Sequence, residues 1–203
     1  MALVVDTKGA EQLFVVGGTD PKGEPVSKVH AFDVATGAWR TLPSLAMPRA
    51  CHRAQVLDDG SVLVTGGSGT WPSPATASCE LLRPGATKWV DTGDLLQKRS
   101  CHGMAVAGSR VFVAGGMVDP TQAGFDIIGT CEVFDVVQQC WAGAPALRMA
   151  RFGLQLLPCK GDFIAAVGGR GPHPSAEMSV EVLDTRQSDL GQWIEEPQSS
   201  LSR

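Results

Sequence analysis

The feature that most restricts the fold of this chain is a pair of adjacent glycines that recurs at nearly constant intervals. The pairs are Gly17-Gly18, Gly66-Gly67, Gly115-Gly116 and Gly168-Gly169, and successive pairs lie 49, 49 and 53 residues apart. Tryptophans keep the same period at Trp39, Trp89, Trp141 and Trp193, and arginines precede the last three pairs at Arg49, Arg99 and Arg151. Because three kinds of landmark share one period of about 50 residues, the sequence predicts four copies of one structural unit.

Each unit is expected to contain four strands. In the first unit, apolar or alternating stretches at Ala2–Val5, Leu13–Val16, Val29–Val34 and Trp39–Leu42 are separated by turn residues. The same order recurs over residues 54–90, 104–141 and 154–193. The glycine pair permits the positive φ of a sharp exit from the second strand, and the tryptophan suits the space between neighbouring sheets. A period of this length predicts a propeller of four-stranded blades.

The units resemble kelch repeats, in which an arginine, a strand ending in Gly-Gly, a Glu–aromatic–Asp strand and a tryptophan follow one another. In the third unit these read KRSCH, VFVAGG, CEVFDV and CW. The resemblance extends from Ala2 to Trp193 and departs from the pattern at His30, which replaces the glutamate of the first unit. It implies an all-β, kelch-type β-propeller with four four-stranded antiparallel blades.

We expect one kelch-repeat domain over residues 1–203, with a polar tail at residues 197–203. Its blades are predicted at approximately residues 2–45, 46–95, 96–147 and 148–196. Kelch-type propellers usually carry more than four blades, which leaves three arrangements open: a closed ring of four, an open array that a longer product would complete, and one completed by another chain. An open or incomplete ring is favoured, and its end blades would expose apolar faces that promote self-association.

Composition excludes several classes of partner. The 17 basic and 21 acidic residues give a net charge of −4, which argues against nucleic acid, since phosphate binding needs clustered Lys and Arg. No apolar run is long enough to span a bilayer, and the first residues do not form a secretory signal, so a cytoplasmic location is expected. None of the six cysteines falls in C-x-x-C spacing, and reduced thiols are predicted.

The resemblance implies that a partner would bind at one rim, where the loops after the glycine pairs meet the connections between blades. Repeat symmetry would place Arg49, Arg99 and Arg151 in an arc there, where guanidinium groups could hold a carboxylate or an acidic peptide. The alternative, left open, is that they tie adjacent blades together through backbone carbonyls.

Three further residues are candidates for partner binding. Arg170 directly follows its glycine pair, where the other units have Thr19, Ser68 and Met117, so the repeat does not require it. Trp71, in the loop WPSP, and Phe125, in the longest loop, could each provide an aromatic anchor or fold over their own loop.

No catalytic motif, cofactor or metal site is predicted. Cys51-His52 and Cys101-His102 are adjacent residues, whose side chains point to opposite faces of a strand and could not share one ion. The chain has no tyrosine, on which kelch-like copper oxidases depend.

The preferred function is therefore a non-enzymatic protein-interaction module. One alternative is a sugar epimerase similar to the sialic acid mutarotases, with Glu80, Glu132 and Glu181 as acid–base candidates, although their recurrence favours a structural role. The other is a partial propeller with no independent activity.

Overall fold

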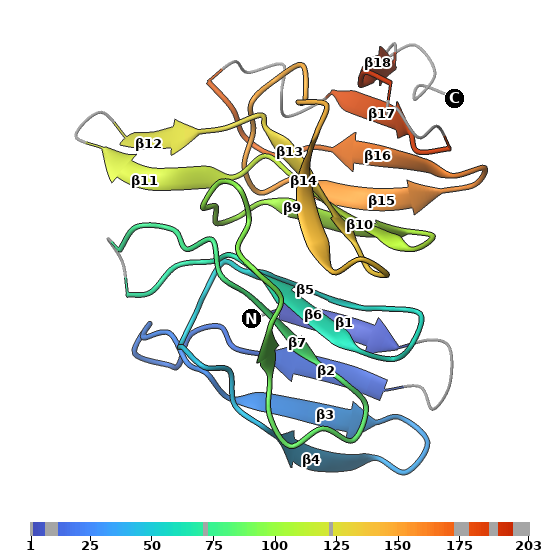
Figure 1. The fold of residues 1–203 in the computed structure, drawn as a ribbon. Coiled ribbons are helices and arrows are strands. Elements are labelled where there is room, and N and C mark those ends of the chain that lie inside the picture. Colours follow the sequence, from blue (N-terminus) through green and yellow to red (C-terminus); the bar gives the residue numbers. More distant parts are fainter. Residues whose placement is uncertain are drawn as a thin grey trace. The chain divides into compact units, whose positions relative to one another are not determined.

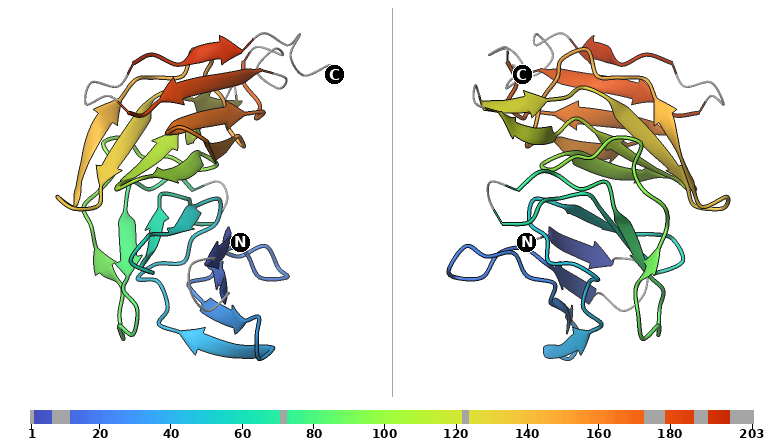
Figure 2. Two further views of the ribbon diagram at one scale, coloured as in Figure 1. Left: turned by 90° about the vertical axis from the view of Figure 1, so that its right-hand side faces the viewer. Right: turned by 60° about the vertical axis from the view of Figure 1, so that its left-hand side comes forward.

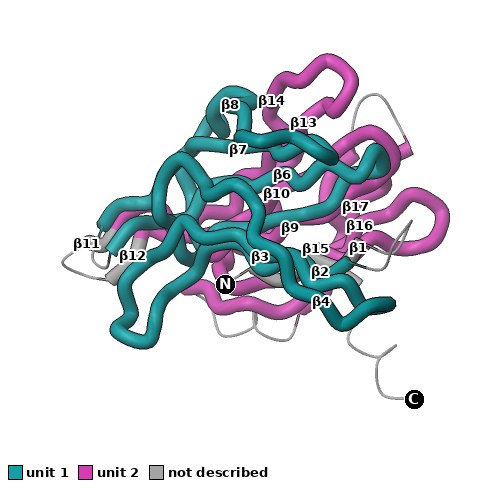
Figure 3. Tube along the Cα trace, turned by 90° about the horizontal axis from the view of Figure 1, so that it is seen from below, with its two compact units in different colours: residues 1–100 teal, residues 101–203 magenta. Residues whose placement is uncertain are grey.

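The computed structural model describes residues 2–6, 12–70, 73–121, 124–172, 179–186 and 191–196. These residues form strands β1 to β18 and no helix (Figure 1). The chain divides into two compact units, residues 1–100 and residues 101–203 (Figure 3). The single domain over residues 1–203 and the blade boundaries stay predictions.

Unit 1 contains two antiparallel sheets, each built from four consecutive strands. The first sheet comprises β1 (Ala2–Asp6), β2 (Gln12–Val16), β3 (Val29–Asp33) and β4 (Ala38–Leu42). The second comprises β5 (Arg53–Val56), β6 (Val62–Thr65), β7 (Cys79–Leu82) and β8 (Val90–Asp91). The first strands of the two sheets, β1 and β5, lie against each other, as radial blades require.

Unit 2 repeats this plan. Its first sheet comprises β9 (Gly103–Ala107), β10 (Arg110–Ala114), β13 (Cys131–Asp135) and β14 (Cys140–Ala144). Its second sheet comprises β15 (Gln155–Cys159), β16 (Phe163–Val167), β17 (Val180–Asp184) and β18 (Ile194–Glu196). β9 lies against β15, and the strands of each sheet show the usual twist in Figure 2. The predicted four sheets of four antiparallel strands are thus confirmed.

One pair of strands was not predicted. The stretch expected as a loop in the third repeat contains the hairpin β11 (Met117–Thr121) and β12 (Gly124–Ile127), whose register shifts between Met117 and Pro120. Proline cannot donate to a ladder and is tolerated only at irregular positions such as this shift. The hairpin extends the loop after Gly115-Gly116 into a separate two-stranded sheet.

Each unit has its own apolar core between its two sheets. In unit 1, Phe14, Val16 and Ala31 pack against Val62 and Val64. In unit 2 the core includes Phe112, Leu154, Ile164, Leu183 and Trp193. All four residues of β6 are buried, which explains why this second strand reads as a continuous apolar run rather than an alternating one.

The glycine pairs are required by backbone conformation and by close packing. Gly67 has a φ of +98°, and a Cβ at this position would lie 2.7 Å from the carbonyl oxygen of Ala50 and 2.8 Å from Cβ of His52. A side chain there would be both strained and in collision with the connection that precedes β5. The pair therefore lets the chain turn while the connection passes directly over it.

Candidate functional site: the glycine rim

The loops after the glycine pairs and the connections between sheets meet at the same sheet edge in each unit. We call this edge the glycine rim; it comprises residues 17–28, 43–52, 66–70, 73–78 and 92–100 in unit 1, and residues 115–121, 124–130, 145–153 and 168–172 in unit 2. The amide of Gly18 donates to the Arg49 carbonyl at 2.9 Å, and the amide of Gly116 donates to the Arg151 carbonyl at 2.8 Å. These bonds hold each connection over the glycine pair of the preceding sheet.

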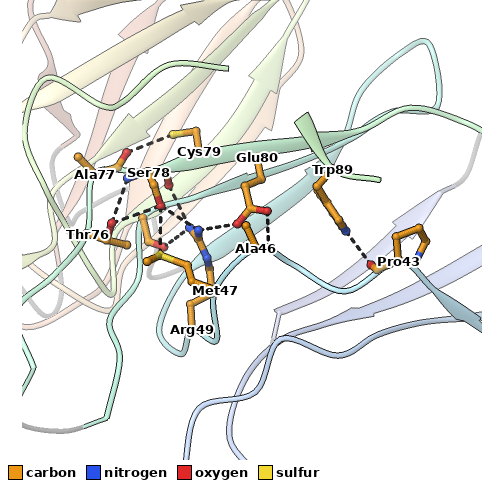
Figure 4. Close-up of polar contacts among 11 residues, drawn as sticks. Pro43, Ala46, Met47, Arg49, Thr76, Ala77, Ser78, Cys79, Glu80 and Trp89 are labelled. Carbon is orange, nitrogen blue, oxygen red and sulfur yellow. Dashed lines mark hydrogen bonds and ion pairs between the residues drawn. The ribbon is translucent and has the colours of Figure 1, made fainter. Parts of the chain in front are cut away.

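Arg49 extends in the opposite direction, into the sheet that follows it (Figure 4). Its Nη1 donates to the carbonyls of Gly66 (2.9 Å) and Ser78 (3.0 Å), and its Nη2 donates to Ser78 Oγ (2.8 Å). The same Nη2 forms an ion pair with Glu80 Oε1 at 2.7 Å, while Glu80 Oε2 accepts from the amide of Ala46 at 2.8 Å. Burial lowers the pKa of Arg49 below its ordinary value, and the Glu80 carboxylate opposes that shift.

Arg151 makes the same contacts in unit 2. Its guanidinium donates to the carbonyls of Gly168 (3.0 Å) and Ser179 (3.2 Å), to Ser179 Oγ (2.5 Å) and to Glu181 Oε1 (2.7 Å). The Glu181 carboxylate also accepts from the amide of Arg148 at 2.6 Å. The connection between two sheets is therefore held in the same way in both units. The arginine carbonyl accepts a hydrogen bond from the preceding sheet, and the arginine side chain binds the following sheet.

These contacts bear on the predicted arc of arginines. The exposed fractions of Arg49, Arg99 and Arg151 are 1%, 0% and 0%, so their guanidinium groups are not presented to solvent. For Arg49 and Arg151 the structure shows the alternative role, the tying of neighbouring sheets through carbonyls. Direct partner binding by the three arginines stays a prediction, and their burial does not favour it.

The glutamates that carried the epimerase alternative belong to the same network. Glu80 and Glu181 each accept hydrogen bonds from the connection and from its arginine, and Glu132 is 2% exposed. A carboxylate that is held in a buried ion pair is not poised to take a proton from a ligand. This is the structural role that the repeated glutamate position indicates.

Of the four repeated tryptophans, Trp89 and Trp193 fill the space between sheets as predicted, whereas Trp39 and Trp141 each stack on a phenylalanine of their own sheet. The indole of Trp89 donates to the Pro43 carbonyl at 2.7 Å, and that of Trp193, 2% exposed, donates to the Pro145 carbonyl at 2.8 Å. Trp39 is 60% exposed and stacks on Phe32 of its own sheet, with ring centroids 5.0 Å apart.

An open depression of about 480 Å³ lies on the glycine rim of unit 1. Its lining includes the Met47 thioether, the hydroxyl groups of Ser68, Ser73 and Thr76, and the Lys98 side chain. Met47 is 44% exposed. Sequence reasoning missed Met47 and Lys98, although each stands within two residues of a repeated arginine. An apolar contact, several hydroxyl groups and one ammonium are suited to an extended peptide that carries a carboxylate.

Arg170 occupies the position in unit 2 that Ser68 occupies in unit 1. Ser68 and Ala50 exchange two backbone hydrogen bonds of 2.9 Å, and Arg170 and Phe152 exchange two of 2.8 Å. The side chain of Arg170 is exposed. Because Ser68 lines the depression in unit 1, the equivalent position in unit 2 places a cation at the rim.

The two aromatic candidates cannot be placed in the same way. Trp71 lies outside the described residues. Of Phe125 only the backbone is described, where it pairs with Pro120 in the β11–β12 hairpin. Their roles at the rim stay predictions.

His52 lies under the glycine pair of the first sheet. It is 4% exposed, its Nε2 donates to the Val16 carbonyl at 3.0 Å, and burial lowers its pKa to about 4, with a further contribution from Arg49. Its neighbour Cys51 is exposed and has a φ of +54°. Histidine is therefore neutral at pH 7 and serves as a hydrogen-bond donor between the connection and β2.

Across the described ranges, no helix combines the length and apolar character needed to cross a membrane.

Comparisons with known proteins agree with this architecture. A family model described as Kelch motif matches residues 9–46. Kelch-like protein 34 of Homo sapiens is 27% identical over 179 residues, which cover 81% of this chain and 27% of that protein. Kelch-like protein 25 of Xenopus tropicalis is 31% identical over 134 residues, which cover 64% of this chain and 20% of that protein. The chain thus spans about a quarter of the length of these relatives.

A solved structure shows the same fold. The structure of YjhT superimposes with a TM-score of 0.73 and 16% identity, and the match covers 97% of this chain and 64% of that one. Together with the four repeated sheets and the Arg–Gly-Gly–Glu–Trp network, this similarity defines the architecture. The chain is similar to kelch-repeat proteins and has the fold of a kelch-type β-propeller.

Proposed function

We propose that the chain is a protein-interaction module, and not an enzyme, that binds a partner peptide or protein through its glycine rim. The observation that carries this proposal is the open depression at Met47, Ser68 and Lys98, in a rim whose backbone is fastened by buried arginines. A surface that is ordered before binding loses little conformational entropy when a partner arrives. The similarity to kelch-like proteins supports a binding role.

The chemistry of the rim favours an acidic, extended partner. Lys98 lines the depression in unit 1, and Arg170 is exposed at the equivalent strand exit in unit 2. Each cation can form a charge-assisted hydrogen bond with a carboxylate, and the hydroxyl groups of Ser68, Ser73 and Thr76 can pair with a peptide backbone. Trp71 and Phe125 are proposed as aromatic anchors for the same partner.

The test is a selection of peptides from a random display library on the full chain, followed by affinity measurement. K98E should weaken peptides that bind the rim of unit 1, and R170E should weaken those that bind the rim of unit 2, each about tenfold or more, because an attraction is replaced by repulsion. K88E and R186E make the same charge changes at exposed positions outside the rim and should leave affinity unchanged. Equal affinity for all four variants would contradict the proposal, as would full retention of every partner after joint replacement of Arg170 and Trp71.

We also propose a cytoplasmic location and self-association through the first sheet. Six free cysteines suit a reducing compartment. Trp39, whose indole is exposed, is equivalent in the repeat to Trp89 and Trp193, each of which packs between two sheets. Sedimentation of the chain and of Trp39→Ser should show a concentration-dependent dimer that the substitution removes, whereas a monomer in both would contradict self-association.

A further inference from the structure

Unit 1 has a second concave surface, which does not belong to the glycine rim. It is an open groove of about 610 Å³ between the first and second sheets. Gln12 at the start of β2, Gly60 in the β5–β6 turn and Arg83 after β7 line it. These residues lie at the strand ends opposite to the glycine pairs, so we call this surface the hairpin groove.

The groove exists because the outer edge of the second sheet is short. β7 ends at Leu82, and β8 contains only Val90 and Asp91. Residues 83–89 connect them, whereas residues 34–37 and 136–139 suffice for the corresponding turns β3–β4 and β13–β14. Residues 83–87 of this longer connection line the groove together with Arg40, Thr41 and Leu42 of β4.

The floor of the hairpin groove is apolar. Phe14, Val62 and Leu82 contribute to it from three different strands and are held in place by burial, with exposed fractions of 6%, 2% and 5%. Leu42 and Pro43, both half-buried, extend the floor toward β4. A floor of this kind can receive one apolar side chain without rearrangement of the core.

Among the described residues, the walls of the groove carry positive charge and no carboxylate. Two arginines line it, Arg40 from β4 and Arg83 from the β7–β8 connection, and both are exposed. Arg40 Nη2 donates to Gln12 Oε1 at 2.6 Å. Within the described part of the chain, no residue accepts a hydrogen bond from the Arg83 guanidinium, a group with five N–H donors. In a chain with a net charge of −4, a groove whose described lining holds two cations and no acidic residue is complementary to an anion.

We propose that the hairpin groove binds a short peptide segment of a partner protein in which an apolar side chain stands next to an aspartate or glutamate. The apolar side chain occupies the floor formed by Phe14, Val62 and Leu82. The adjacent carboxylate binds Arg83, and Arg40 supplies a second donor. This site is independent of the glycine rim, and neither requires the other.

The test is a titration of the isotope-labelled full chain, followed by two-dimensional NMR, with the end-blocked peptide acetyl-Gly-Ser-Leu-Asp-Ser-Gly-amide. Saturable shifts are expected at the amides of Gly60, Gly85 and Ala86, with a dissociation constant of about 1 mM for so small a ligand. Peptides in which asparagine replaces the aspartate, or serine replaces the leucine, should each bind at least about fivefold more weakly.

Variants of the chain separate the groove from its surroundings. R83A should weaken the leucine–aspartate peptide about fivefold, and Thr87→Trp should abolish binding by filling the groove from an exposed position. K88A removes the neighbouring charge outside the groove and serves as the matched control, which should not change affinity. K98E alters only the rim, so it should weaken rim binding and leave these shifts unchanged. Unaltered rim binding in K98E, with these shifts retained, would disprove the proposed function and not this inference.

The inference would be overturned by the absence of saturable shifts up to about 10 mM peptide. It would also be overturned by equal affinities in R83A and K88A, or by shifts confined to Ser68 and Thr76 on the rim.

Discussion

Replacement of Glu181 by alanine should remove a large part of the stability of unit 2. Glu181 is fully buried, pairs with Arg151 at 2.7 Å and accepts from the amide of Arg148 at 2.6 Å. Without the carboxylate, the Arg151 guanidinium, which is 0% exposed, would remain charged and would lose its ion pair with Glu181. Removing one partner of such a buried pair costs about 3–5 kcal/mol.

One further cost comes from the backbone. The amide of Arg148 would lose its acceptor, at about 1 kcal/mol. The total of about 4–6 kcal/mol is comparable with the entire unfolding free energy of many domains, which is about 5–15 kcal/mol. We therefore expect E181A either to unfold unit 2 at 25 °C or to lower its urea midpoint strongly.

The assay is urea denaturation followed by tryptophan fluorescence, to which Trp193, 2% exposed, should contribute a change when unit 2 opens. The matched control is D184A, which removes a carboxylate from the exposed pair of Asp184 with Arg186, three residues along the same strand. This substitution should leave the midpoint unchanged, because exposed pairs are screened by solvent. Equal midpoints for E181A and D184A would refute the fastening role assigned to the buried arginine.

Three further predictions concern unit 1. The pKa of His52 is about 4 in the folded chain against 6.5 for the free side chain, so the unfolded state takes up a proton first as pH falls. The unfolding free energy should therefore be highest above pH 6.5 and decrease by up to about 3 kcal/mol toward pH 4. Urea titrations at each pH should show this dependence, and H52Q should flatten it. Burial raises the pKa of the Cys79 thiol to about 12, so a thiol reagent at pH 8 should label exposed Cys140 and leave Cys79 unmodified until unfolding, and equal rates would contradict the described burial. Gly67→Ala should lower the unfolding free energy by more than about 2 kcal/mol in the same urea assay. Gly85→Ala is the control: it is also at positive φ but has no atom within 4 Å of the new Cβ, and it should cost about 1 kcal/mol. Similar costs for the two variants would show that the close approach at Gly67 is unimportant.

The strands were predictable because local signals agreed with tertiary packing. The third strand of the first repeat was expected at Val29–Val34 and runs from Val29 to Asp33, where the alternation of apolar side chains meets a turn. The hairpin β11–β12 was missed because Asp119 and Pro120 are typical of loops, and its pairing is irregular at that point. Local sequence could not indicate that the two strands pair with each other alone.

The direction of the arginine side chains was not predictable from their position. A long cationic side chain at a sheet edge can point to solvent or into a ring of carbonyls, and the repeat is compatible with both. The repeated glutamates did carry a signal. Arg49 and Arg151 precede Glu80 and Glu181 by 31 and 30 residues, and each arginine forms a buried ion pair with its glutamate. The hairpin groove had no such signal, because it depends on the β7–β8 connection lying beside β4.

Amide hydrogen exchange of the full chain, with and without a peptide selected from the display library, shows directly whether the partner binds at the glycine rim. Binding at the glycine rim should slow exchange at Ser68 and Thr76 in unit 1 and at Gly171 in unit 2. Binding at the glycine rim would be contradicted if protection were confined to the opposite strand ends, at the turns of residues 34–37 and 136–139. It would also be contradicted if a bound peptide changed exchange at none of these amides.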